Sequence, residues 1–282
     1  DAEGHNIFIG EEPVAYSKLV LAWGAEPVAA RIEGDAGEHV FAINDLQDYA
    51  NFRAELDGKK RVLVMGAGLI GCEYANDLTN GDYQVEVVAP SNQILPNLLP
   101  EQAASAVQQG LEGLGVKFHL GPLITRANKI EKGLVADLSN GEQIETDIIV
   151  SATGIELNTL NDINVSVDGV KVEANRKLSY KGMMLSGVPN LAISFGYVNS
   201  SWTLRADLTC EYVCRLINTM DKEGCAVCSP EEDLNALVED DYIDFTSGYV
   251  QRALDRLPKQ GKKSPWRNYQ NYLLDIFYVR LF

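Results

Sequence analysis

Six consecutive residues in the first half of the chain have the spacing that accommodates a dinucleotide pyrophosphate. The motif Gly66-Ala67-Gly68-Leu69-Ile70-Gly71 directly follows the apolar segment 61–65 and opens a helix predicted to end near residue 78. The first glycine permits a tight bend, the second lets phosphates approach the backbone, and the third lets helix and strand pack closely. Free N–H groups and the positive end of the helix dipole would hold the phosphates. The alternative is a glycine-rich turn that binds nothing.

The next predicted strand, residues 84–88, should end beside the adenosine ribose. A carboxylate at that end would bind the 2′-hydroxyl, and a basic residue would accept a 2′-phosphate. Glu86 comes too early in the strand, and no Lys or Arg occurs between Ala89 and Pro100. We therefore expect Ala89, Ser91 and Asn92 to line the site. Ser91 and Asn92 would replace the missing carboxylate, and NAD(H) is favoured over NADP(H).

Two predicted strands on either side of this unit end in small residues. One ends in Leu21-Ala22-Trp23-Gly24 and the other in Ser151-Ala152-Thr153-Gly154. Small residues at a strand end let the backbone cross between domains or approach a ligand closely. With the nucleotide unit between them, the pair indicates one domain inserted into another. Ala152, Thr153 and Gly154 are therefore further candidate cofactor-binding residues.

The remaining elements follow from apolar periodicity and turn residues. Asn44 is a candidate N-cap for a helix over residues 44–56. Asn-Gly within Ser139–Glu142 predicts a hairpin. The other predicted strands are 7–9 and 18–22 around a turn at 10–13, 116–119, 147–152, 165–167 and 191–195. Further helices are predicted over 100–114 and 202–220, an acidic loop over 229–241, and two short amphipathic helices within 249–282.

Composition narrows the class of protein. A net charge of −16 over 282 residues argues against a nucleic-acid partner, and no apolar run is long enough to cross a bilayer. Five cysteines, an odd count, indicate reduced thiols and a cytoplasmic location. Cys210 and Cys214, or Cys225 and Cys228, could hold a metal or form a redox pair. The first pair lies in a predicted helix and the second lacks a thioredoxin-like context, so no metal site is expected.

Residues 7–152 resemble a flavoprotein reductase with two dinucleotide-binding domains, most like the rubredoxin–NAD reductases. The resemblance rests on residues 16–27, 66–73 with 76–78, and 110–116. It implies that NADH passes hydride to FAD and that the flavin passes single electrons to a small electron-transfer protein such as rubredoxin. It also implies that Glu73 lies near the nicotinamide end of the NADH site.

Residues 155–282 resemble a different family, the C-terminal part of class B flavin monooxygenases of the Baeyer–Villiger type. The matching segments are 178–190, 196–204 and 257–261 with 265–267. In both families the region around Gly196 would lie near the flavin. The sequence therefore reads as a hybrid, with a join expected within residues 121–157.

Two departures from these families bear on activity. Both families hold the FAD pyrophosphate with a strand–GxGxxG–helix of their own, whereas this sequence has one such motif, assigned to NADH. The segment that identifies the monooxygenases, Phe-x-Gly-x-x-x-His-x-x-x-Trp, is also missing. We therefore assign no catalytic residue, and we expect a chain truncated in front.

These patterns predict an α/β protein. A Rossmann-like three-layer nucleotide-binding domain, residues 36–152, would be inserted in an incomplete FAD-binding domain, residues 1–35 and 153–220, with a C-terminal helical cap over 221–282. The first functional hypothesis is an NAD(P)H-dependent, FAD-linked oxidoreductase that reduces a small redox protein. The second is a flavin-containing monooxygenase, and the third is a catalytically incomplete nucleotide-binding fragment.

Overall fold

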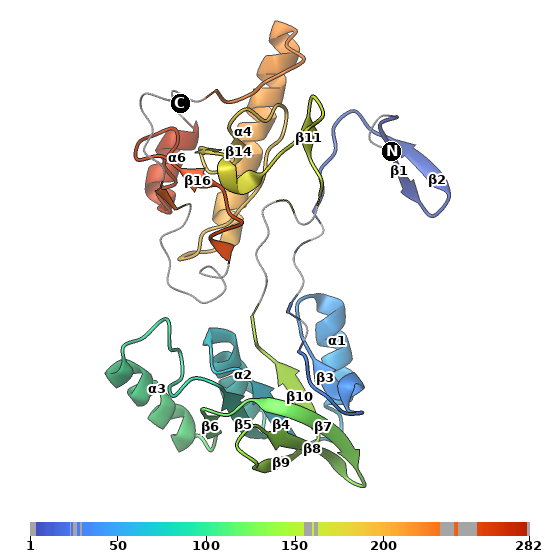
Figure 1. Ribbon diagram of the computed structural model, residues 1–282, viewed down its shortest axis with the longest axis vertical. Helices are drawn as coiled ribbons and strands as arrows, with labels where there is room; N and C mark the ends of the chain where they lie inside the picture. Colours follow the sequence, from blue (N-terminus) through green and yellow to red (C-terminus); the bar gives the residue numbers. More distant parts are fainter. Residues whose placement is uncertain are drawn as a thin grey trace.

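A computed structural model describes residues 4–22, 24, 27–28, 30–154, 160, 163–231, 240–241 and 253–280. The secondary structure comprises an N-terminal hairpin, a central unit around a parallel sheet, and a C-terminal unit that contains two packed helices (Figure 1). Residues 155–157, the last part of the range expected for the join, lie outside the described residues, as do most of the acidic loop and residues 249–252 of the first tail helix.

The central unit is built on a five-stranded parallel sheet. Its order is β3 (Val40–Phe41), β10 (Ile148–Ser151), β4 (Arg61–Met65), β5 (Gln84–Ala89) and β6 (Lys117–Leu120). Each neighbouring pair is parallel. The strands predicted at 61–65, 84–88, 116–119 and 147–152 are thus confirmed to within one residue at each end.

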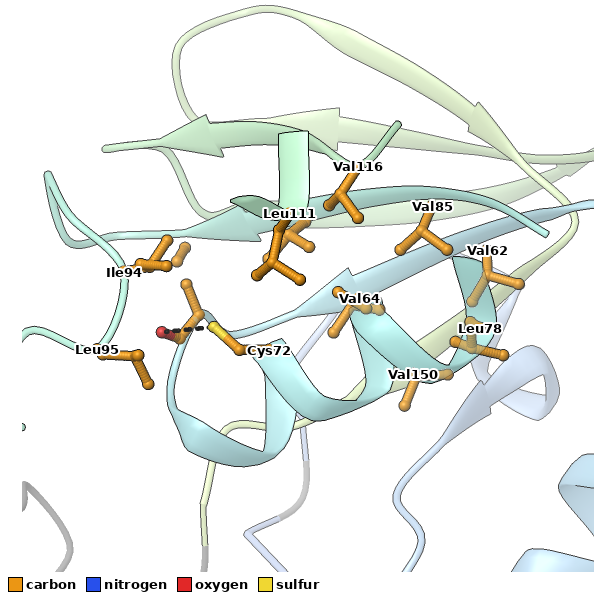
Figure 2. Packing of buried hydrophobic residues seen from close by; sticks show 14 of the residues in the cluster. Val62, Val64, Cys72, Leu78, Val85, Ile94, Leu95, Leu111, Val116 and Val150 are labelled. Atoms are coloured by element: carbon orange, nitrogen blue, oxygen red, sulfur yellow. Dashed lines mark hydrogen bonds between the residues drawn. The ribbon is translucent and has the colours of Figure 1, made fainter. Parts of the chain in front are cut away.

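Three helices cover one face of this sheet: α1 (Leu46–Glu55), α2 (Leu69–Asn80) and α3 (Glu101–Gly113). Cys72, Ala75 and Leu78 of α2 recur every three residues and are buried against the strands. Figure 2 shows Cys72 and Leu78 packed over Val62 and Val64 of β4. The helices are therefore amphipathic elements held by this shared core.

The N-cap predicted for α1 was wrong by one residue. Asp45 caps the helix, because its carboxylate accepts a 2.8 Å hydrogen bond from the backbone N–H of Asp48. The Asp48 side chain in turn accepts from the backbone N–H groups of Asp45 and Asn44. This reciprocal capping box satisfies two donors that a single cap at Asn44 would leave unpaired.

An antiparallel sheet covers the other face, so the central unit has three layers. Its strands are β7 (Ile124–Ile130), β8 (Gly133–Leu138) and β9 (Gln143–Thr146). Leu63 of β4 and Val88 of β5 point into this second core. Gly141 adopts a φ of +89° in the turn between β8 and β9, which confirms the predicted hairpin.

The N-terminal strands differ from the prediction. β1 (Asn6–Ile9) pairs with β2 (Glu12–Ala15), whereas residues 18–22 form no strand. Val20 is 87% exposed. A strand requires a neighbour for its backbone hydrogen bonds, and among the described residues none pairs with this segment.

The C-terminal unit combines short hairpins with two packed helices. Two hairpins pair β11 (Ser166–Val167) with β12 (Val170–Lys171) and β13 (Ser179–Tyr180) with β14 (Met184–Leu185). A further strand, β15 (Asp240–Asp241), pairs antiparallel with β16 (Lys259–Gln260). The helices are α4 (Trp202–Glu223) and α6 (Tyr272–Arg280). The long helix predicted over 202–220 is confirmed, but it continues for three more residues to Glu223 and ends where Gly224 takes a φ of +69°.

The strand predicted over 191–195 is not formed. Ile193 donates one backbone hydrogen bond, to Met183, and no ladder follows it. The apolar residues of this segment pack against Val172 and Leu185 instead. Burial rather than strand pairing therefore explains why apolar residues recur in 191–195. None of the helices described is both long and apolar enough to cross a membrane.

Candidate dinucleotide site

The glycine turn lies at the carboxyl end of β4, and two of its glycines are required by the fold itself. Gly66 has a φ of +111°, and a Cβ there would lie 2.6 Å from the carbonyl oxygen of Ala152. A Cβ at Gly71 would overlap the carbonyl oxygen of Gly66. Close packing of the turn, α2 and the end of β10 therefore excludes side chains at both positions.

Gly68 differs from these two glycines. Its φ of −77° and ψ of −171° are open to any residue, and a Cβ there would meet no atom within 4 Å. No contact within the described protein therefore requires a glycine at this position. The space is open where the second glycine of a dinucleotide motif lets the pyrophosphate approach.

Gly68 is also the N-cap of α2. It has no side chain to cap the helix, and the first turn of α2 contains no acidic residue. The first N–H groups of a helix have no partner within it, and they carry the positive end of the helix dipole. Leu69 and Ile70 are 53% and 54% exposed, so this end of α2 is accessible to an anion.

The topology brings three predicted segments to one edge of the sheet. From β4 the chain proceeds outward through β5 to β6, while β10 and β3 lie on the other side of β4. The direction of strand order thus reverses between β4 and β10, and ligands of open α/β sheets bind outside such a switch point. Ala152 N–H donates to Met65 O at 2.8 Å, which places residues 152–154 beside the glycine turn.

The segment after β10 also connects the central unit to the rest of the chain. Gly154, with a φ of +99°, accepts a 3.1 Å hydrogen bond from Val28 N–H. The Thr153 and Ser151 hydroxyl groups lie 3.3 Å apart. Val28, which precedes the central unit in sequence, therefore lies beside Gly154, which follows it.

The end of β5 is joined to the same turn. Gly66 N–H donates to Val88 O at 2.8 Å, and Leu95 N–H donates to Ala67 O at 2.8 Å. The loop after β5 thus returns to the glycine turn, with Leu95 in the core. This return was not predicted from the sequence, although the apolar pair at 94–95 within a polar loop was the available signal.

Glu86 is occupied elsewhere. Its carboxylate lies 2.7 Å from His119 Nε2 and 3.2 Å from Lys117 Nζ, both on β6. Ala89, at the end of the strand, is 2% exposed, and Asn92 beyond it is exposed. The Glu86 carboxylate is therefore engaged by side chains of β6.

The two residues that follow the turn in α2 have different environments. Cys72 is buried, its Sγ lies 3.7 Å from Ala67 O, and burial raises the pKa of its thiol to about 11 (Figure 2). The thiol therefore stays protonated near neutral pH and acts as a packing group. Glu73 is exposed on the first turns of α2.

The other cysteines form no metal centre in the described part of the chain. It contains no group of three or more His, Cys, Asp or Glu side chains placed to hold an ion. Cys228 exchanges hydrogen bonds with Asn190 through its backbone, which makes residues 225–228 a structural loop. Among the described residues, 66–71 is the only glycine turn between a parallel strand and a helix N-terminus. These residues fit the phosphates of one dinucleotide.

Comparison with known proteins adds two relatives and one solved structure. The chain is 49% identical over 156 residues to a rubredoxin–NAD(+) reductase of Alcanivorax borkumensis, covering 55% of this chain and 41% of that protein. It is 47% identical over 143 residues to the FAD-containing monooxygenase EthA of Mycobacterium tuberculosis, covering 51% and 29%. Both predicted resemblances are thereby confirmed, and the chain spans less than half of either relative.

The fold has a counterpart among solved structures. The water-forming NADH oxidase of Lactobacillus brevis, bound to NADH, superposes with a TM-score of 0.54 at 19% identity. The match covers 66% of this chain and 42% of that one. The model of the pyridine nucleotide-disulphide oxidoreductase family matches residues 3–190, which is more than half of the chain. The chain belongs to the pyridine nucleotide-disulphide oxidoreductase family.

Proposed function

We propose that the central unit binds NAD(H) and that the chain acts in an FAD-linked oxidoreductase that passes electrons from NADH to a small electron-transfer protein such as rubredoxin. The open position at Gly68, at the N-terminus of α2 and at the switch point of the sheet, carries the first part. The identity to a rubredoxin–NAD(+) reductase supports the second part.

The pyrophosphate, the adenosine ribose and the nicotinamide would each lie beside the end of a different strand. Residues 66–71 would hold the pyrophosphate, and Ala89, Ser91 and Asn92 would lie at the adenosine ribose. Residues 152–154 and Glu73 would lie toward the nicotinamide. A bound flavin would accept hydride and release single electrons, and the protein would position the two cofactors.

The preference for NAD(H) rests on charge. Residues 89–100 contain no Lys or Arg, so the site has no local cation to hold a 2′-phosphate. The proposal also includes the domain limits given above, with 36–152 inserted between 1–35 and 153–220. A cytoplasmic location is part of it, because all five cysteines are free.

The identity to EthA favours a second candidate, a flavin monooxygenase. Conversion of a cyclic ketone to its lactone would distinguish the two. Because the sequence lacks the segment that identifies these monooxygenases, we expect the FAD-supplemented chain to form no lactone with NADH or NADPH. Product detected by gas chromatography would favour the monooxygenase over the reductase.

Three glycine substitutions test the nucleotide site. Gly68→Leu should abolish NADH binding and leave the fold intact, because its side chain would fill the approach of the phosphates while its Cβ meets no protein atom within 4 Å. Gly71→Ala should unfold the central unit, because its Cβ overlaps Gly66 O. Fluorescence titration with NADH and circular dichroism separate these effects.

Gly110→Ala is the matched control for both variants. Gly110 lies within α3, and a Cβ there also meets no atom within 4 Å. Alanine in a helix interior is more favourable than glycine by about 0.5–1 kcal/mol. This variant should therefore bind NADH normally and be slightly more stable to unfolding. Undiminished NADH affinity in Gly68→Leu would show that the motif is only a turn.

A further inference from the structure

The loop after β5 contains three polar residues in succession, and the structure distinguishes them. The Ser91 hydroxyl donates to Gln93 O at 2.7 Å, and Gln93 Nε2 donates to Leu99 O at 3.2 Å. Both side chains therefore hold the loop in shape. Asn92 is exposed, and within the described residues its amide makes no hydrogen bond.

The loop is anchored on both sides of Asn92. Leu95 N–H bonds to Ala67 O in the glycine turn, and Gly121 N–H bonds to Ala89 O at the end of β5. Asn92 Oδ1 lies 3.7 Å from the position that a Cβ on Gly121 would occupy. The amide thus sits between the ends of β5 and β6, at the edge where the glycine turn also opens.

The loop after β5 has no charged side chain at this edge of the sheet. Residues 89–100 contain neither an acidic nor a basic side chain. Glu86, the nearest carboxylate on β5, is paired with His119 at 2.7 Å and Lys117 at 3.2 Å. This loop therefore has neither a free carboxylate to repel a 2′-phosphate nor a cation to attract it.

From these observations we propose that Asn92 is the specificity-determining residue for the adenosine ribose, which it recognises through an uncharged amide. The inference rests on the proposed NAD(H) site. An amide can accept from the 2′-hydroxyl and donate to it. Because it has no charge to oppose a 2′-phosphate, NADH is preferred over NADPH by less than about tenfold, and one charge at position 92 sets the preference.

Substitution by charged residues tests this assignment. Asn92→Asp should weaken NADPH binding by about tenfold, because the new carboxylate would repel the 2′-phosphate. NADH affinity should stay within about threefold of its original value. Asn92→Arg should strengthen NADPH relative to NADH by about tenfold, and this gain should shrink in high salt. Fluorescence titration with both nucleotides measures the ratio.

Asn80 provides the matched control. It is exposed at the last position of α2, about 18 Å along the helix from Gly68. Asn80→Asp and Asn80→Arg introduce the same charges and should leave the NADPH-to-NADH ratio unchanged. An unchanged ratio in both Asn92 variants, with NADH still bound, would overturn the assignment. Failure of the unsubstituted chain to bind NADH or ADP-ribose would instead refute the proposed function and, with it, this assignment.

Discussion

Lys181 lies in the C-terminal unit with 6% of its surface exposed. Its ammonium group donates to Tyr278 O at 3.0 Å and lies 4.6 Å from the centre of the Tyr212 ring. Burial, together with the nearby Arg215 guanidinium, lowers the pKa of Lys181 to about 8. The folded chain therefore releases this proton at a lower pH than the unfolded chain does.

This shift predicts a rise in stability above pH 8. Between about 8 and 10.5, the usual lysine value, the unfolded chain binds a proton at Lys181 that the folded chain lacks. The free energy of unfolding should then increase by up to about 1.4 kcal/mol per pH unit. Above pH 10 it should fall again, because burial raises the pKa of Tyr197 and Tyr212 above their usual 10.0.

Urea unfolding of Lys181→Met across this range checks the prediction. The rise between pH 8 and 10 should vanish, while the fall at higher pH should remain. Lys222→Met, at an exposed lysine in the last turn of α4, should keep both. An equal rise in the Lys181→Met variant would assign the pH dependence to another group.

At the scale of elements, α4 and α6 are joined by a buried ion pair. Arg205 Nη1 and Asp275 Oδ2 lie 2.8 Å apart, and their side chains are 3% and 4% exposed. The Tyr197 hydroxyl donates to the same carboxylate at 2.7 Å. Lys181 and Arg215 bind backbone carbonyls at the end of α6, where cations complement the helix dipole.

Removing one partner of this pair should lower the free energy of unfolding by more than removing both charges does. Arg205→Met leaves the Asp275 carboxylate buried and unpaired, and should lower the free energy of unfolding by about 3–5 kcal/mol. Adding Asp275→Asn removes that charge and keeps an acceptor for Tyr197, so most of the loss should be recovered. The exposed pair Arg176–Glu173 gives the control, since Arg176→Met should cost under about 1 kcal/mol. Additive losses in the double variant would contradict this account.

At the scale of the whole molecule, four hydrophobic clusters of the described residues separate by unit. Two clusters draw their residues from 32–152, and two others draw theirs from 165–279. The N-terminal segment contributes to none of these clusters, and Phe8, Ile9 and Val20 are 58%, 70% and 87% exposed. The dinucleotide site therefore depends on the central unit, which has its own core.

We expect the 282-residue chain to bind NADH but to retain little FAD. Its sequence has one glycine turn of the phosphate-binding kind, which the proposal assigns to NADH. Without a second turn the flavin dinucleotide loses several charge-assisted hydrogen bonds, each contributing about 1.5–3 kcal/mol. Its affinity should fall by several orders of magnitude.

Absorbance after gel filtration measures this directly. The purified chain should be colourless or faintly yellow, with NADH–ferricyanide activity near background, while NADH titration shows a folded site. Stoichiometric flavin retained through the column would refute the prediction. It would also imply that residues 66–71 can serve FAD.

Local pattern determined most elements of the central unit, although β3 was not predicted. A short apolar strand, a glycine turn and an amphipathic helix are specified by neighbouring residues, so 61–65, 66–71 and α2 could be placed from sequence. The parallel sheet followed from the same pattern, whereas the resemblance to flavoprotein reductases also needed residues 16–27, 76–78 and 110–116. Capping chemistry was less certain, because Asn44 and Asp45 are both suitable caps and only the contacts of Asp48 choose between them.

Tertiary structure decided what depends on distant partners. The apolar residues at 18–22 and 191–195 suggest strands, yet a strand exists only where another segment supplies hydrogen bonds, and neither segment has such a ladder. The different roles of Gly68 and Gly71 likewise appear only when β10 and the turn are in place. Sequence could nominate both Ser91 and Asn92, whereas only the folded loop shows that Ser91 is bonded to Gln93 and Asn92 is exposed, because hydrogen-bond partners are set by three-dimensional proximity.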